Sequence, residues 1–90
     1  MDKVIITVVG KDTVGIIARV CTYLAEKQVN ILDISQTIVQ EYFNMMMIAD
    51  MEHAVVPFEE VAGALDRLGE EIGVKIRCQR EEIFTKMHRI

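Results

Sequence analysis

The fold is decided by eight residues near the start of the chain, Val9-Gly10-Lys11-Asp12-Thr13-Val14-Gly15-Ile16. An apolar run precedes them and a helical pattern follows, so they predict a strand-to-helix connection of about five residues, a common length. Asp12 or Thr13 is expected to cap the helix, because a short side-chain oxygen accepts from the unpaired N–H groups of the first turn. Gly15 then falls inside that turn, where glycine lowers helix stability relative to alanine. A glycine at this position indicates either that the helix packs closely on the sheet or that a ligand lies against the backbone, where no side chain is in the way.

The elements on either side of this connection carry strong patterns. Residues 3–9 are nearly all β-branched and are apolar on both faces, which is typical of a central strand covered on both sides. Residues 13–28 predict a helix, because apolar side chains recur along one face at three-and-four spacing. Those side chains are Ile17, Val20, Cys21 and Leu24.

Two further strands follow the helix. Residues 29–40 predict the second strand, but Asp33 breaks its alternation, which indicates a β-bulge near Leu32 and Asp33. Residues 43–51 predict the third, with Met45 and Met47 on one face and Met46 on the other. We expect one of these faces to meet the helices and the other to meet a partner chain.

The last part of the chain predicts a helix, a strand and a tail. Pro57 opens the helix, where its missing N–H is tolerated, and Gly73 ends it. Residues 74–79 alternate apolar and polar side chains, which indicates a strand with one wet face. Residues 81–90 predict a short amphipathic helix that packs onto the domain or onto a partner. Its apolar side chains are Ile83, Phe84, Met87 and Ile90.

The order of the elements predicts the architecture. Strand, helix, strand, strand, helix, strand is the pattern of ferredoxin-like βαββαβ folds in the α+β class. Right-handed crossovers place both helices on one face of a four-stranded antiparallel sheet, with the first and third strands central. We expect a single domain over residues 1–90, with a core over residues 3–80 and the tail over 81–90. The uncovered face would expose an apolar patch from Val4 to Met51, which predicts a homodimer, because monomers rarely tolerate such a patch.

Composition narrows the function classes. The 90 residues carry a net charge of −4, which argues against nucleic acid and against an anionic membrane surface as partners. No apolar run is long enough to span a membrane and no signal peptide is visible, so a cytoplasmic location is expected. Cys21 and Cys78 fit no ligand-spacing motif, and in a reducing compartment both are expected as buried thiols.

Two motifs carry a resemblance to the ACT-domain family over roughly residues 3–80. They are Gly10-Lys11-Asp12-Thr13-Val14-Gly15-Ile16-Ile17 and Val29-Asn30-Ile31-Leu32-Asp33-Ile34-Ser35-Gln36. Residues 33–37 and 41–43, with the tail, further resemble small stand-alone ACT proteins, which are similar to regulatory domains of the glycine-cleavage-repressor type and of formyltetrahydrofolate deformylase. The resemblance implies a ferredoxin-like fold, paired domains and regulation by small ligands, often amino acids. It implies ligand contacts at Asp12, Thr13, Val14, Gly15, Ile16, Asn30 and Ile31.

An amino acid suits the chemistry of these residues. Its carboxylate needs N–H donors, which a helix N-terminus supplies, and its ammonium needs acceptors, which Asn30 or Asp12 can supply. We therefore expect a non-catalytic regulatory module that binds an amino acid or similar metabolite near a dimer interface. The alternative is an interaction or assembly subunit with a vestigial pocket, which engages an unidentified protein partner.

Enzyme, metal and cofactor functions find less support in the sequence. No activating context surrounds a nucleophile such as Cys21, so no catalytic residue is assigned. Lys11 lies in an order that is not a P-loop, and strand alternation divides the three methionines at 45–47 between two faces, which disfavours a soft-metal site. His53 and His88 lack ligand spacing, so neither a metal nor a cofactor is expected.

Overall fold

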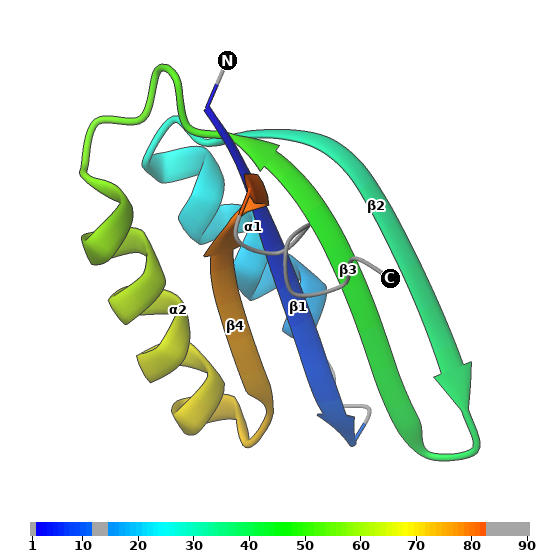
Figure 1. Ribbon diagram of the computed structural model, residues 1–90. Helices are drawn as coiled ribbons and strands as arrows, with labels where there is room; N and C mark the ends of the chain where they lie inside the picture. The colour runs from blue at the N-terminus through cyan, green and yellow to red at the C-terminus, as the bar shows by residue number, and fades with distance from the viewer. Residues whose placement is uncertain (1, 12–14, 83–90) are drawn as a thin grey trace.

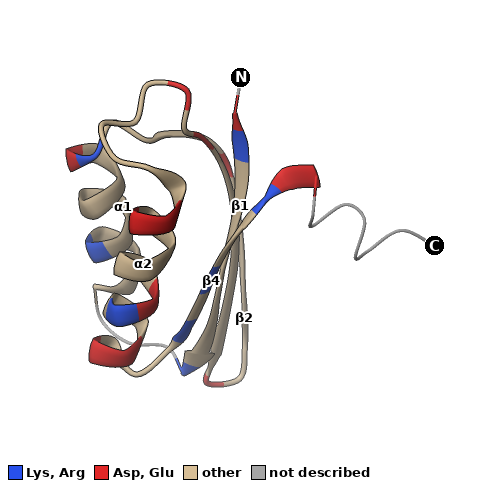
Figure 2. Ribbon diagram, turned by 60° about the vertical axis from the view of Figure 1, so that its left-hand side comes forward, with Lys and Arg blue, Asp and Glu red and all other residues tan. Residues whose placement is uncertain are grey.

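Residues 2–11 and 15–82 are described by the computed structural model, in which strands and helices follow one another in the predicted order. The strands form one antiparallel sheet in the order β2-β3-β1-β4 (Figure 1). Both helices lie on the same side of this sheet (Figure 2). The fold is therefore the predicted ferredoxin-like one, with β1 and β3 central. The elements are β1 (Lys3–Lys11), α1 (Ile16–Glu26), β2 (Asn30–Val39), β3 (Tyr42–Asp50), α2 (Phe58–Ile72) and β4 (Lys75–Arg80).

The start of α1 differs from the prediction. The helix begins at Ile16, not at residue 13, and Gly15 is its N-cap, with a φ of 85° in the left-handed region. A Cβ built on Gly15 would meet no heavy atom within 4 Å. The backbone angle therefore requires this glycine. This corrects the expectation that Gly15 lies inside the first turn, and the open space around it disfavours close packing, one of the two roles expected for it. Asp12 and Thr13, expected as caps, lie outside the described residues.

The predicted β-bulge in β2 is confirmed. Ile31 and Asp33 pair with consecutive residues of β3, so Leu32 is the extra residue between them. The bulge changes the phase of the strand, so Ile34 lies opposite Met47 on the side of the sheet that faces the helices.

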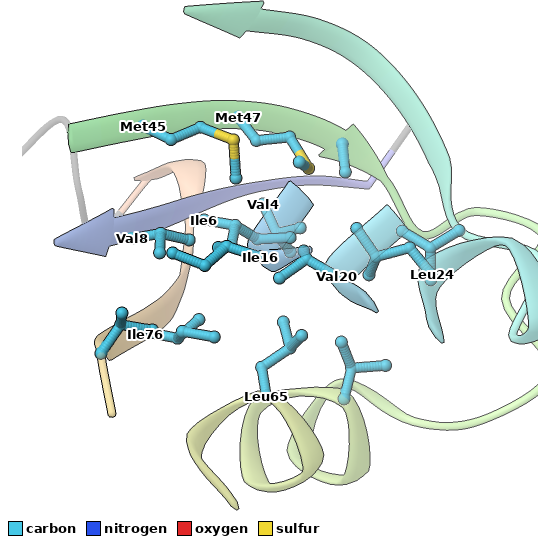
Figure 3. Packing of buried hydrophobic residues seen from close by; sticks show 14 of the residues in the cluster. Val4, Ile6, Val8, Ile16, Val20, Leu24, Met45, Met47, Leu65 and Ile76 are labelled. Atoms are coloured by element: carbon cyan, nitrogen blue, oxygen red, sulfur yellow. The ribbon is translucent and has the colours of Figure 1, made fainter. Parts of the chain in front are cut away.

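The core lies between the sheet and the two helices (Figure 3). Met45 and Met47 are fully buried, whereas Met46 is 41 % exposed, so the face of β3 with Met45 and Met47 is the one that meets the helices. Each helix contributes one buried stripe to this core, as the apolar periodicity predicts. The stripes are Ile16, Val20 and Leu24 on α1, and Val61, Leu65 and Gly69 on α2.

The expected apolar patch on the uncovered face is confirmed in part, because Val9 of β1 and Met46 of β3 lie on that face and are 49 % and 41 % exposed. Val4 and Met51, between which the patch was expected, are themselves buried in the helix-side core. No residue of β2 is buried, because the helices do not cover this edge strand. Most of the other large exposed apolar side chains lie on β2 and at the start of β3: Leu32, Ile34, Ile38, Val39 and Tyr42.

Candidate functional site

The N-terminus of α1 presents backbone to solvent. Gly15 is exposed, and its carbonyl accepts the N–H of Arg19 at 2.9 Å, so the first helical turn is regular. No side chain among residues 2–11 and 15–82 caps the helix. Its first N–H groups lack intrahelical partners, and such groups together with the helix dipole can bind an anion.

Ile16 can contribute only its backbone to a ligand at this end. Its side chain is 2 % exposed and belongs to the core. The other predicted contacts of this loop, Asp12, Thr13 and Val14, lie outside the described residues. Gly15 and the N–H of Ile16 are therefore the described part of the predicted loop site.

Asn30 and Ile31 lie at the opposite end of the sheet. Asn30 pairs with Asp50, which in turn pairs with Lys3 at the start of β1. Gly15 comes after the other end of this nine-residue strand. With a rise of about 3.3 Å per residue, the two ends of β1 are about 26 Å apart. One chain therefore does not bring the two predicted parts of the site together.

A cavity of about 390 Å³ adjoins Asn30 and is lined in part by Asp50 and His53. Asp50 is only 9 % exposed, and its Oδ1 accepts the N–H groups of Glu52 and Asp2, each at 3.0 Å. These hydrogen bonds, that of Glu52 first, lower the pKa of Asp50 and favour its ionised form. Asp50 lies within the predicted third strand, and no sequence motif assigns it to a site. Asp50 lies opposite Asn30 in the pairing of β2 with β3, so knowledge of this strand register would have placed the two residues in one site.

A second cavity, of about 470 Å³, lies in the groove between α1 and α2. At this groove, Arg19 of α1 and Glu71 of α2 form an ion pair of 2.8 Å. Tyr23 lines the groove, and its buried hydroxyl has no hydrogen-bond partner among the residues that the structure describes. Burial, and next the charge of Glu60, raise the pKa of Tyr23. No sequence motif predicts this groove, because its existence depends on the distance between the two packed helices.

Metal and thiol chemistry find no support in the part of the chain that the structure describes. Within residues 2–11 and 15–82, no three His, Cys, Asp or Glu side chains gather into a metal-binding group. Cys21 and Cys78 are free and half-buried. Burial raises the pKa of Cys78 to about 11, so this thiol stays protonated at neutral pH. Among the same residues, no helix is long and apolar enough to cross a membrane.

Comparison with known proteins agrees with the fold. The family model of the ACT domain matches residues 2–79. A UPF0237 protein of Bifidobacterium longum is 69 % identical over 90 residues, and the match covers both chains completely. Among solved structures, an ACT domain protein from Streptococcus pneumoniae superposes with a TM-score of 0.79 at 42 % identity, covering 92 % of this chain and 93 % of that one.

Two more distant structures share the fold alone. A structure described as a glycine cleavage system transcriptional repressor has a TM-score of 0.75 at 23 % identity, over 88 % of this chain and 45 % of that one. A formyltetrahydrofolate deformylase from Pseudomonas syringae has a TM-score of 0.81 at 21 % identity, over 89 % of this chain and 28 % of that one. The resemblances noted in the sequence are thereby confirmed at the level of fold.

Proposed function

Because the chain belongs to the ACT-domain family, whose members are generally regulatory ligand-binding modules, we propose that it is a non-catalytic module that binds an amino acid. The observation that carries the proposal is the N-terminus of α1, where Gly15 leaves open space beside the backbone. The proposed site is this loop, completed by the first residues of β2. Its residues are Asp12, Thr13, Val14, Gly15, Ile16, Asn30 and Ile31.

The two ends of an amino acid match the two parts of this site. The carboxylate accepts hydrogen bonds from the first N–H groups of α1, including that of Ile16, where the helix dipole favours an anion. The ammonium donates to the side-chain carbonyl of Asn30, which is exposed. A ligand with both groups therefore needs both parts of the site close together.

A second copy of the chain brings the two parts together. β2 is an edge strand with free backbone groups along one side, and such an edge is a template for pairing with another strand. If two copies of β2 pair antiparallel about a two-fold axis, the partner's Asn30 moves to the end of the sheet where Gly15 lies. The exposed Ile34 and Ile38 supply apolar surface for such a contact. The homodimer of this proposal thus uses β2, not the open face of the sheet.

The alternative function is an assembly subunit without a ligand. The exposed apolar side chains on β2 favour it, because they are suited to an unidentified protein partner as much as to a second copy. Val39 and Tyr42, at the far end of β2 and the start of β3, are 62 % and 52 % exposed. Occupancy of the proposed site distinguishes the two functions.

A thermal-shift screen tests the proposal. Each standard amino acid is added in turn, followed by nucleotides and folates, and the melting temperature is recorded. A ligand at 100 times its Kd stabilises the folded state by about 2.7 kcal/mol, which raises the Tm of a chain of this length by about 10 °C or more. An amino acid that gives this shift supports the regulatory module.

The control is a pair of variants with exposed side chains. Asn30→Ala should remove most of the shift, because it deletes the acceptor for the ammonium. Val55→Ala, which changes a side chain that is 67 % exposed in the connection between β3 and α2, should keep it. No shift with any compound at millimolar concentration would contradict the proposal and favour the assembly subunit.

A further inference from the structure

The ion pair between Arg19 and Glu71 shows how α1 and α2 face each other across their groove. The two helices run in opposite directions (Figure 1), and this pair joins the first half of α1 to the last turn of α2 at 2.8 Å. Because both helices rise by about 1.5 Å per residue, equal steps toward the end of α1 and toward the start of α2 reach the same level of the groove. Glu26 of α1 is therefore level with Ala64 of α2.

The groove has the size and the lining of a small-molecule site. Its cavity of about 470 Å³ falls within the range of about 300–1,000 Å³ that is typical of such sites. Small and apolar side chains line much of it, namely Ala18, Ala64 and Leu68. Tyr23 also lines the groove, but its hydroxyl is buried and does not reach an occupant. Recognition of polar groups therefore depends on the charged side chains at the two ends of the groove.

The charged side chains differ between the two ends of the groove. At the end near the start of α1, Arg19 and Glu71 neutralise each other. Glu26 and Arg67 line the other end, and neither of them forms an ion pair with any residue that the structure describes. A Cβ built on Gly63 would stand 3.4 Å from Nη1 of Arg67, so this guanidinium extends back along α2 toward the level of Glu26. Glu26 and Arg67 therefore present opposite charges from the two walls of this end.

A molecule with both charges fits this end of the groove better than a molecule with one. An anion alone would be attracted by Arg67 and repelled by Glu26, and a cation alone would be attracted by Glu26 and repelled by Arg67. Glu26 is also the last residue of α1, where the helix dipole favours a cation. The ligand chemistry that matches these walls is an ammonium and a carboxylate joined to an apolar body.

We propose that this end of the groove binds a small zwitterion with an apolar body, which is the chemistry of a free aliphatic or aromatic amino acid. Its carboxylate pairs with the guanidinium of Arg67, its ammonium pairs with the carboxylate of Glu26, and its apolar part lies along Ala64 and Leu68. The inference goes beyond the proposed function, because Gly15 lies at the opposite end of α1, about 16 Å from Glu26 along the helix axis. Either site can exist without the other.

Titration of nitrogen-labelled protein with L-leucine and with L-phenylalanine, followed by the amide chemical shifts, tests the site. The largest shifts should fall on Thr22, Ala64 and Leu68. Isocaproate lacks the ammonium of leucine and isoamylamine lacks its carboxylate, so each should bind about five-fold more weakly, which is the loss expected for one solvent-exposed charge contact. No shift with either amino acid, or equal affinity for leucine and both analogues, would overturn the proposal.

Four variants test the two charges. Arg67→Gln and Glu26→Gln should each raise the Kd of L-leucine about five-fold. The matched controls, Arg77→Gln on β4 and Glu70→Gln on α2, should leave this Kd unchanged, because neither residue lines the groove. All four side chains are exposed, so the fold should tolerate the changes. An equal Kd in all four variants would overturn the roles of Arg67 and Glu26.

The positions of the chemical shifts separate the groove from the other surfaces of the chain. Shifts confined to Gly15 and Ile16 would overturn the groove site and would support the proposed loop site instead. Shifts at Ala64 and Leu68 without shifts at Gly15 would support the groove site and leave the loop site without this ligand. If neither amino acid binds and Arg67→Gln lowers self-association in sedimentation, the groove is occupied by a second copy of the chain and the proposal is overturned.

Discussion

Gly69 of α2 lies against the backbone of Val74, just before β4, and a Cβ built on Gly69 would stand 2.7 Å from the carbonyl oxygen of Val74. The N–H of Val74 also donates to the carbonyl of Gly69 at 2.9 Å. The nearest atom to this Cβ belongs to the backbone, which cannot move aside as a flexible side chain could, and Cγ1 of Ile76 stands 3.1 Å away. The end of α2 therefore lies so close to the start of β4 that only a residue without a side chain fits at position 69.

Gly69→Ala should destabilise the protein, because the added methyl forces α2 away from β4. Such overpacking costs about 1–3 kcal/mol of unfolding free energy, measured by denaturant titration. Gly63→Ala on the same helix is the matched control, since its Cβ would meet only the end of the Arg67 side chain, at 3.4 Å. That change should stabilise the helix by about 0.5–1 kcal/mol. Equal effects of the two variants would contradict the role of Gly69.

Gly15→Ala should lower stability by about 1 kcal/mol or more, because a φ of 85° is unfavourable for a residue with a Cβ. Gly15→Asn should lose less, since asparagine tolerates the left-handed region and its side chain can cap the helix. Denaturant titration of both variants gives the comparison. A gain in stability for the alanine variant would mean that the glycine angle is not required.

The features that the sequence predicts correctly depend on local pattern. The bulge at Leu32 follows from two phases of alternation within one strand, and α2 follows from Pro57 at its start and Gly73 at its end. The role of Gly15 was harder to predict, because it depends on where the helix starts: a start at residue 13 places Gly15 in the first turn, whereas the observed start at Ile16 makes it the N-cap.

The site was predictable only in part, because its geometry depends on strand pairing. The motifs around Gly15 and Asn30 are recognisable in sequence, but only the sheet register shows that they lie at opposite ends of β1. The exposure of Ile34 and Ile38 was also unpredictable, since alternation alone places these side chains on the face that the helices cover. Their exposure depends on how far the helices extend over the sheet.

Because of Asp50, the free energy of unfolding should vary with pH in the acid range. The N–H groups of Glu52 and Asp2 lower its pKa in the folded state below the ordinary value of about 3.9. The stability that Asp50 contributes is therefore fully present above the unfolded pKa, and it is lost as the pH falls through the folded pKa. Asp50→Asn should be less stable than the unmodified protein at pH 7, and the difference should shrink below about pH 3.9.

Asp66→Asn is the control for this pH series, because Asp66 lies exposed on α2. Stability differences are measured by denaturant titration from pH 7 down to the acid limit of folding. A difference between Asp50→Asn and the unmodified protein that stays constant down to pH 3 would contradict the assigned hydrogen bonds.

Ile38→Lys should weaken self-association if β2 forms the dimer interface. Ile38 is 57 % exposed, so a lysine there is tolerated in a single chain, whereas charge on an edge strand opposes pairing. Val55→Lys changes an equally exposed apolar residue away from β2 and should leave association unchanged. Sedimentation equilibrium measures both. A dimer that persists unchanged in Ile38→Lys would place the interface elsewhere, and a monomeric unmodified protein would refute the dimer itself.

A mixing experiment tests whether the proposed site is shared between two chains. Asp12→Trp should block the loop, and Asn30→Ala should remove the acceptor, so each homodimer has two damaged sites. If Gly15 of one chain and the partner's Asn30 form one site, a mixed dimer has one site with both changes and one site with neither. Random mixing in equal amounts should then restore about a quarter of all sites. Calorimetric titration of the mixture, refolded together from denaturant, with the ligand from the thermal screen counts them. No recovery after mixing would show that both parts of the site come from the same chain, which the separation of Gly15 and Asn30 along β1 argues against.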